Sequence, residues 1–334
     1  MSTTIFFALN ESHELATSVS RYAGLPLCAL EERAFEGGEF KLRPLQSVRD
    51  CPTFVLQCLA GTAAAPLCER LVKLLFLLHG LRDAGATRRT ALLPYLAFAR
   101  KDRRTQVRDP VNSRYVAQLL ESAGVDRVVT LDVHNPAALD NSFRMPLDHL
   151  SALPMMVDHF STRLPDAPLT VVSPDVGGVK RAQIFRELLE SRLGNAVELA
   201  FFEKRRAKGV VSGETLVGDP GGRIVIIIDD LCATGGTLIR AAEGCARAGA
   251  GAVYAAVTHA PHIPGLTAVL ANETVRGVVT TDSVGYSFGA LQDQTARRLT
   301  VLPVAPLFGE ALRRMLSGKP LAPLLECWPV TDPT

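Results

Sequence analysis

Two adjacent carboxylates, Asp229 and Asp230, stand between an apolar run at residues 224–228 and the short segment Thr-Gly-Gly-Thr at 234–237. The apolar run, bounded by charge and glycine, is typical of a strand buried on both faces of a parallel sheet. The segment at 234–237 would offer backbone N–H groups and two hydroxyls at the start of a helix near Leu238, where a phosphate binds favourably. Because two acids would repel a bare phosphate but accept hydrogen bonds from sugar hydroxyls, the stretch predicts a site for a phosphorylated ribose.

A simpler interpretation of this stretch stays open. The glycines could serve only a tight strand-to-helix turn, and the aspartates could cap the helix. Cys232, next to the same turn, is either a reactive thiol or a small buried side chain, and the second is favoured because Leu231 and Ala233 flank it.

Two basic segments could neutralise further phosphate groups. Cationic residues are concentrated at 100–108, directly after Tyr95 and Phe98, whose rings could contact an aromatic base. A second group at 203–208, next to Gly209, suggests a mobile loop able to close over a polyphosphate. Each segment could instead be a solvated loop.

Two acid-containing segments at predicted strand ends suggest a Mg²⁺ site. His134 follows the sequence Asp132-Val133, and Asp175 precedes two glycines. His134 could also be a hydrogen-bonded core residue. Similarly, the Glu-Gly-Gly-Glu segment at 36–39 could be no more than a hairpin turn between two strands.

Strands and helices alternate along the chain, which indicates an α/β protein with mainly parallel sheets. Strands are expected at 5–9, 54–57, 89–94, 128–131, 169–172, 197–202, 224–228, 252–258, 277–281 and 299–304. Helices are expected at 12–23, with Ser12 as N-cap, and at 66–84, 112–124, 179–192, 238–249, 263–271 and 306–316. Residues 146–153 are expected to begin the connection between two units.

Length and composition limit the class of protein. The 334 residues are enough for two domains, and a formal net charge of +2 argues against a general role at nucleic acids or membrane surfaces. The seven cysteines form no C-x-x-C pair, so neither a disulfide framework nor a zinc site is indicated. The first residues lack the features of a secretory signal. We therefore expect a cytoplasmic protein.

Taken in order, the segments FEGGE, PYLAFARKDRR, TLDVH, VVSPDVGG, EKRR and DDLCATGGT resemble those of the ribose-phosphate pyrophosphokinase (PRPP synthetase) family. The similarity runs from about residue 5 to about residue 316 and includes connecting and C-terminal segments. The resemblance implies two similar phosphoribosyltransferase-type domains, each a mainly parallel sheet flanked by helices. The boundaries that we expect are 1–152 for the ATP-binding domain, 153–305 for the ribose 5-phosphate and catalytic domain, and 306–334 for a C-terminal helix and tail.

The resemblance also implies a reaction and a set of site residues. Members of the family move the β,γ-diphosphoryl group of ATP to the 1-hydroxyl of ribose 5-phosphate, giving PRPP and AMP, with Mg²⁺ as cofactor. Lys204 and Arg206 would be catalytic. ATP would be bound by Gly37, Gly38, Glu39, Arg100 and Lys101. Ribose 5-phosphate would be bound by Arg206, Asp229, Asp230, Ala233, Thr234, Gly235, Gly236 and Thr237. The metal site would include His134 and Asp175.

Three positions depart from the family pattern: Gly37 replaces an acidic residue, Lys101 a glutamine and Ala233 an aspartate. They bear on nucleotide and pentose-phosphate preference, and not on the type of reaction. The alternatives are a PRPP-consuming phosphoribosyltransferase and a non-catalytic regulatory paralogue. As in the family, a homo-oligomer, dimer or hexamer, is expected.

Overall fold

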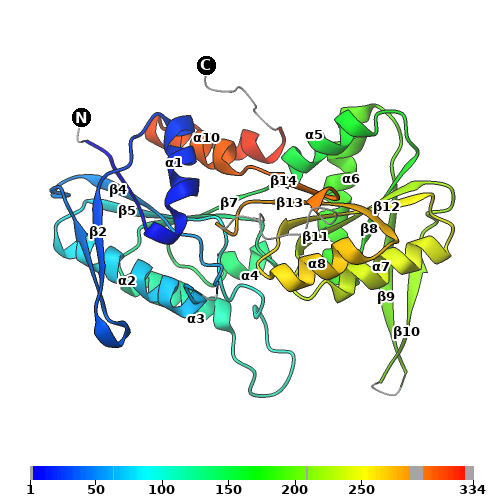
Figure 1. The fold of residues 1–334 in the computed structure, drawn as a ribbon, viewed down its shortest axis with the longest axis horizontal. Coiled ribbons are helices and arrows are strands. Elements are labelled where there is room, and N and C mark those ends of the chain that lie inside the picture. The colour runs from blue at the N-terminus through cyan, green and yellow to red at the C-terminus, as the bar shows by residue number, and fades with distance from the viewer. Residues whose placement is uncertain (1–2, 63, 208–209, 286–295, 328–334) are drawn as a thin grey trace.

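The structure is a computed structural model that describes residues 3–62, 64–207, 210–285 and 296–327, with residues 204–207 and 210–214 described by backbone alone. The chain forms two mainly parallel sheets flanked by helices (Figure 1). This arrangement confirms the predicted fold class. Within the described residues, no helix is both long and apolar enough to cross a bilayer.

The first sheet is entirely parallel and has the strand order β1-β4-β5-β6-β7. Its strands are β1 (Ile5–Ala8), β4 (Pro52–Leu56), β5 (Arg88–Leu93), β6 (Arg127–Leu131) and β7 (Leu147–Leu150). Helices α2 (Leu67–Asp83) and α3 (Asn112–Ser122) cover one face. Helices α1 (His13–Ala23) and α10 (Ala305–Leu316) cover the other face.

Strand β1 shows why both faces of this sheet must be covered. Ile5 and Phe7 pack into the core on the α2 and α3 side, whereas Phe6 and Ala8 pack into the core shared with α1 and α10. Successive side chains of a strand point to opposite faces, so a continuous apolar run requires an apolar layer on each side. All four side chains are accordingly buried.

A separate two-stranded hairpin extends from the first sheet. Antiparallel strands β2 (Leu30–Ala34) and β3 (Phe40–Pro44) are joined by the 3₁₀ turn Glu36–Gly38, in which Gly37 and Gly38 have φ angles of +78° and +88°. The hairpin interpretation of this segment is therefore confirmed. Glycine is favoured at both positions because L side chains rarely adopt this backbone conformation.

The second sheet has the order β10-β9-β8-β11-β12-β13-β14, and only β10 runs antiparallel. Its strands are β8 (Leu169–Ser173), β9 (Glu198–Ala207), β10 (Val210–Val217), β11 (Ile224–Leu231), β12 (Ala252–His259), β13 (Val275–Thr281) and β14 (Leu299–Leu302). Helices α5 (Leu153–Arg163) and α6 (Val179–Leu193) lie on one face. Helices α7 (Gly236–Arg247) and α8 (Ile263–Ala271) lie on the other face.

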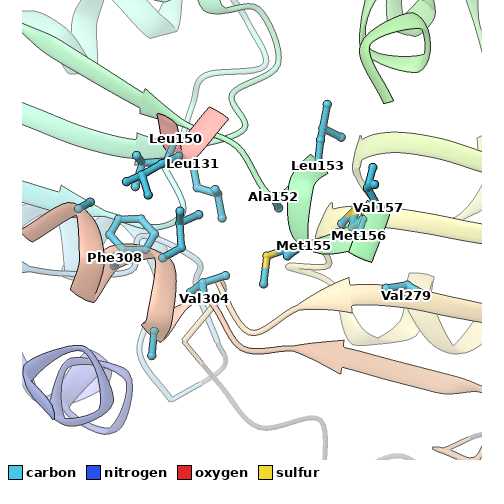
Figure 2. Packing of buried hydrophobic residues seen from close by; sticks show 14 of the residues in the cluster. Leu131, Leu150, Ala152, Leu153, Met155, Met156, Val157, Val279, Val304 and Phe308 are labelled. Atoms are coloured by element: carbon cyan, nitrogen blue, oxygen red, sulfur yellow. The ribbon is translucent and has the colours of Figure 1, made fainter. Parts of the chain in front are cut away.

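One hydrophobic core joins the two sheets. It contains Leu131 and Leu150 from the first sheet, Val279 from the second, and Met156 and Phe308 from helices α5 and α10 (Figure 2). The chain also returns to its beginning, because α10 packs along α1. The two sheets and the C-terminal helix therefore share one core, while the outer faces of the sheets have cores of their own.

Four local expectations were wrong. Residues 203–207 form the end of β9 rather than a loop, because they pair with a strand, β10, that was not predicted; Lys208 and Gly209 lie outside the described residues. Residues Leu147–Leu150 form β7 instead of a connection. Ser12 does not cap α1 with its side chain, since its hydroxyl bonds Gln57 and the Cys58 amide. Helix α7 begins at Gly236 and not near Leu238.

Candidate active site

Side chains from both halves meet where β6 and β11 end. Asp230, at the end of β11, lies between a histidine that follows β6 and an arginine on α6. Its Oδ2 atom is 3.0 Å from Nδ1 of His134, and its Oδ1 atom is 3.1 Å from Nη1 of Arg181. The same Arg181 nitrogen lies 3.4 Å from Oδ1 of Asp229. The two halves of the chain thus form one polar cluster at the carboxyl ends of parallel strands, where such sheets bind ligands.

The two aspartates of this cluster differ in protonation state at neutral pH. Burial, followed by the negative charge of Asp230, raises the pKa of Asp229 to about 8. Burial alone would raise the pKa of Asp230 as well, but the hydrogen bond from His134 and the charge of Arg181 outweigh it and hold that pKa well below its usual range. At neutral pH Asp229 is therefore mostly protonated and Asp230 ionised.

The histidine of the cluster is the partner that Asp230 stabilises in its charged form. The hydrogen bond to Asp230 raises the pKa of His134 above its ordinary value, although burial opposes the shift. Asn135, the residue after His134, donates a hydrogen bond from its side-chain amide to Oδ2 of Asp102 at 2.8 Å. This bond connects the turn after β6 to the basic segment at residues 100–108. The cluster thus combines the ionised Asp230 with the guanidinium of Arg181, and His134 donates its hydrogen bond to the same carboxylate before any ligand binds.

The predicted phosphate loop follows β11 and packs against the start of α8. Gly235 has a φ angle of +79°, and Thr234 is exposed. A Cβ atom on Gly265, in α8, would lie 1.9 Å from the carbonyl oxygen of Ala233. Nδ1 of His262 lies 3.0 Å from the same oxygen. The loop can take this path only because residue 265 has no side chain.

The basic segment borders the cluster from the first half. Arg100 and Tyr95 line a small pocket together with His134 and Asp230. Lys101 is instead paired with Asp109, its Nζ lying 2.5 Å from Oδ2, and the same oxygen accepts hydrogen bonds from the Thr105 and Gln106 amides. The charge of Lys101 is thus already balanced within its own loop.

The other predicted site residues are not bonded to the cluster in the part of the chain whose side chains are described, although Asp175 follows β8, the strand next to β11. Asp175 is bonded within its own turn, where its Oδ1 atom accepts a hydrogen bond from the Gly178 amide at 3.1 Å. The tip of the β2–β3 hairpin, with residues 37–39, extends away from the second sheet (Figure 1). Lys204 and Arg206 occupy alternate positions of β9, and only their backbone is described. The structure therefore brings Arg100, His134, Asp229 and Asp230 together and leaves the hairpin outside this group.

The cysteine beside the phosphate loop is a buried side chain, as favoured from the sequence. Cys232 is 1% exposed, and burial, with a smaller effect of Asp229, raises the pKa of its thiol to about 12. A thiol with this pKa is protonated at neutral pH and unreactive as a nucleophile.

Comparison with known proteins agrees with this geometry. Residues 4–124 match the model of the N-terminal domain of ribose phosphate pyrophosphokinase, and residues 154–266 match that of a phosphoribosyl transferase domain. A ribose-phosphate pyrophosphokinase from Caldanaerobacter subterraneus is 34% identical over 95% of this chain and 96% of its own. One from Hyphomonas neptunium is 35% identical over 95% of this chain and 98% of its own. This chain belongs to the ribose-phosphate pyrophosphokinase family.

A solved structure extends the agreement to the whole fold. The phosphoribosylpyrophosphate synthetase from Mycobacterium smegmatis matches with a TM-score of 0.84 and 32% identity, covering 95% of this chain and all of that one. The chain is thus an enzyme of the transferase class, as the sequence indicated. The two matched segments leave residues 125–153 between them, a range that includes β6 and β7 of the first sheet, and the domain boundaries given above remain predictions.

Sequence reasoning missed several residues that shape the site. Arg181 lies in α6 among other charged residues, where a single arginine carries no signal of its own. His262 and Gly265 stand 29 and 32 residues after Ala233, whose carbonyl they lie against, so only the fold reveals this proximity. His259 was taken only as the residue following a strand, although the sequence Thr-His-Ala-Pro-His at 258–262 places two histidines at a strand end, a pattern like the one that drew attention to His134.

Proposed function

We propose that this protein transfers the β,γ-diphosphoryl group of ATP to the 1-hydroxyl of ribose 5-phosphate, forming PRPP and AMP. One observation carries the proposal: the paired carboxylates Asp229 and Asp230 lead into the phosphate loop, and Asp230 faces His134 and Arg100 of the other half. This arrangement offers one region for a sugar phosphate and an adjacent one for a nucleotide. The full-length relatives carry the name of this activity.

The sugar phosphate would occupy the β11 side of the site. Ionised Asp230 and mostly protonated Asp229 can together accept from and donate to ribose hydroxyls. The loop residues Ala233, Thr234, Gly235, Gly236 and Thr237 would hold the 5-phosphate at the start of α7, a 12-residue helix. Arg206 would add a positive charge.

The nucleotide would occupy the side formed by the first half. Arg100 would contact its phosphates, with Tyr95 supplying apolar surface nearby. Gly37, Gly38, Glu39 and Lys101 complete the proposed ATP-binding set. Because Lys101 is paired with Asp109, its contribution would require either a change of partner or an indirect role in ordering the loop.

Lys204 and Arg206 would stabilise charge on the transferring group. Phosphoryl transfer needs little covalent assistance, so correct positioning and charge neutralisation supply most of the acceleration. The attack of the 1-hydroxyl on the β-phosphorus of ATP breaks the bond to the α-phosphate, and AMP leaves with that phosphate. Lys204 and Arg206, both on β9, would supply the positive charge that this step requires.

The donor set also fits Mg²⁺. This ion prefers oxygen ligands, keeps several waters, and is commonly held by one or two carboxylates together with substrate phosphates. Asp175 and His134 would belong to its site, and the described residues contain no larger group of His, Cys, Asp or Glu that could hold a metal alone. When bound, Mg²⁺ would supply positive charge that offsets the charge of the substrate phosphates.

We further propose a cytoplasmic homo-oligomer. Among the described residues no disulfide joins the cysteines, which is usual in a reducing compartment. The β2–β3 hairpin, whose turn includes Glu39, extends away from β11 of the same chain (Figure 1). A role of Glu39 in ATP binding therefore requires a site completed by a second copy.

The proposed reaction is tested with purified full-length protein, ATP, ribose 5-phosphate and Mg²⁺. We expect AMP and PRPP to form in equal amounts, only when ribose 5-phosphate is present and without any nucleobase. Lys204→Ala should lower kcat at least about 100-fold, since it removes a charge that acts on the transition state. Lys319→Ala is the matched control, because this exposed lysine lies beside the amino ends of β1, β4 and β5, opposite the carboxyl ends that carry the cluster.

Two outcomes would contradict the assignment. A protein that forms no AMP but consumes PRPP when a nucleobase is added is a phosphoribosyltransferase. A protein inactive in both assays that alters the activity of a catalytic family member is a regulatory paralogue. Chromatography of the nucleotides in each of these assays separates the three results.

A further inference from the structure

A buried histidine joins the two halves of the molecule and lines the same small pocket as His134 and Asp230. His259, the last residue of β12, is 4% exposed. Its Nε2 atom lies 3.1 Å from the carbonyl oxygen of Leu131 and 3.2 Å from that of Asp132. Both carbonyls belong to the end of β6, in the first half, immediately before the turn that carries His134.

The protonation of this ring follows from its partners. Two carbonyl oxygens can only accept, so Nε2 must carry a proton. Nδ1 lies 2.7 Å from the hydroxyl of Ser283, which can donate to it. Burial lowers the pKa of His259, so the ring is neutral and acts as a fixed connector between a donor and two acceptors.

The backbone of the same residue supports the sugar-phosphate side. The carbonyl oxygen of His259 accepts a hydrogen bond from the Cys232 amide at 2.8 Å, at the start of the phosphate loop. Leu231 pairs with His259 in the register of β11 and β12. One residue therefore contacts both the strand end that leads to His134 and the strand end that carries Asp230.

A second connection between the halves lies beside the first. Asp132 is 5% exposed and has a φ angle of +33°, which is unusual for a residue with a side chain. Its carboxylate accepts hydrogen bonds from the hydroxyl of Thr258 at 2.6 Å, the hydroxyl of Ser151 at 2.8 Å and the amide of Ala152 at 2.9 Å. These three bonds hold an otherwise strained residue at the start of the turn to His134.

Packing limits the freedom of the ring as well. Tyr95, from the segment after β5, contacts His259 edge to face with 5.1 Å between ring centres. The Cys58 thiol, after β4, donates to the Ser283 carbonyl at 3.0 Å. Ends of β4, β5 and β6 in the first sheet are thus tied to ends of β12 and β13 in the second.

From these contacts we infer that His259 and Thr258 are positioning residues, which set the distance between His134 and Asp230 and so align the nucleotide side of the site with the sugar-phosphate side. Neither residue needs to touch a substrate. The expected loss of kcat rests on the proposed function. The expected change in the distance between His134 and Asp230 does not depend on that function. Misplacement of reacting groups by about 1 Å can cost roughly 100-fold in rate.

The first test replaces His259 by leucine, which fills a similar space without donor or acceptor. We expect kcat to fall at least about 10-fold, with KM for ATP and for ribose 5-phosphate each changing less than about 3-fold, because each half keeps its own binding groups. His259→Gln should recover part of kcat, since its amide nitrogen can reach the two carbonyls. Thr258→Val, which removes one hydroxyl from a nearly unchanged shape, should also lower kcat.

A matched control separates positioning from general stability. His159→Leu replaces another buried histidine, in α5, whose ring packs on Phe160 away from the strand ends. If His259→Leu and His159→Leu lower the melting temperature alike and leave kcat equally unchanged at a temperature where both are folded, the inference is wrong. It is also wrong if His259→Leu raises both KM values and leaves kcat intact.

A crystal structure gives a readout that needs no activity. In His259→Leu or, should that variant not fold, in Thr258→Val, we expect the distance between His134 Nδ1 and Asp230 Oδ2 to exceed that of the unmodified protein by at least about 1 Å. An unchanged distance would overturn the inference. If the unmodified protein forms no AMP, the proposed function fails, and this distance still decides whether His259 and Thr258 position the two side chains.

Discussion

At the scale of single residues, the pair Asp229 and Asp230 shows how position decides the chemistry of identical side chains. They are neighbours in the sequence, yet only Asp230 receives the hydrogen bond from His134, while Asp229 has a distant contact of 3.4 Å with Arg181. Two buried carboxylates in contact cannot both ionise easily. Asp230 takes the charge, and Asp229 retains the proton.

This difference predicts a pH dependence of stability. The folded-state pKa of Asp229 is raised to about 8, so its favourable contribution is complete below its ordinary pKa near 4 and is lost as pH rises through 8. We expect the free energy of unfolding of the ligand-free protein to fall by about 1 kcal/mol per pH unit from this group between pH 5 and 8. Asp229→Asn, which cannot ionise, should flatten that slope in thermal melts recorded across this range. Equal slopes for the two proteins would refute the assignment of the raised pKa to Asp229.

The chemistry of the site residues was easier to foresee than their partners. Adjacent aspartates, a Thr-Gly-Gly-Thr segment and a histidine at a strand end are visible as local patterns, and the structure places Asp230 and His134 in contact. Arg181 is 48 positions from Asp229, and nothing in its surroundings marks it. Partners that come from distant strands or helices depend on the packing of whole elements, which residue types alone do not encode.

At the scale of elements, the phosphate loop depends on a helix that does not contain it. Gly265, in α8, leaves room for the carbonyl of Ala233. Gly265→Ala should displace the loop and raise KM for ribose 5-phosphate about 10-fold or more, because the backbone donors would no longer converge on the phosphate. Gly251→Ala is the control, since a Cβ there would meet only ordinary contacts of 3.6 Å or more. A normal KM in the Gly265 variant would contradict this account of the loop.

The elements themselves were predicted well where their periodicity was strong. Helix α8 was placed at its observed limits, and every buried parallel strand but β7 was found, because continuous apolar runs mark strands covered on both faces. The pairing of β9 with β10 was not predicted, because the basic residues at 203–208 suggested a ligand-binding loop. The β-branched residues Val210, Val211, Thr215 and Val217, which favour a strand, were given too little weight. Charge at a strand end indicates exposure and does not by itself indicate a loop.

At the scale of the molecule, the distance of the hairpin tip from the β11 side of the same chain predicts shared sites. We expect Glu39→Ala and Asp230→Asn each to be inactive alone, and their co-expression to restore activity well above the sum of the two. Recovery is possible because one mixed pair of subunits would contain an intact Glu39 and an intact Asp230 at the same site. Absence of recovery, with mixed oligomers shown to form, would place Glu39 outside the site.

The packing of α10 on α1 makes a separate prediction. A Cβ atom on Gly309 would lie 2.3 Å from Cβ of Tyr22, so Gly309→Ala should destabilise the protein by about 1 to 3 kcal/mol through overpacking. Gly80→Ala, in α2 with open space around it, should instead stabilise by up to about 1 kcal/mol. Denaturant unfolding of the two variants measures whether each substitution lowers or raises the free energy of unfolding. Destabilisation of similar size in both would rule out a close helix contact as the cause.

The covering of the first sheet by α10 has a consequence for the order in which the protein is made. The strands that carry Phe6 and Leu56 are translated about 250 residues before the helix with Leu307 and Phe308, which covers the same face together with α1. At translation rates of about 5 to 20 residues per second, the part of that face that α10 covers stays unshielded for roughly 10 to 50 seconds in each nascent chain. The core on this face can therefore be completed only after α10 has been translated, and we expect chaperones that hold nascent chains to associate with the chain during that interval.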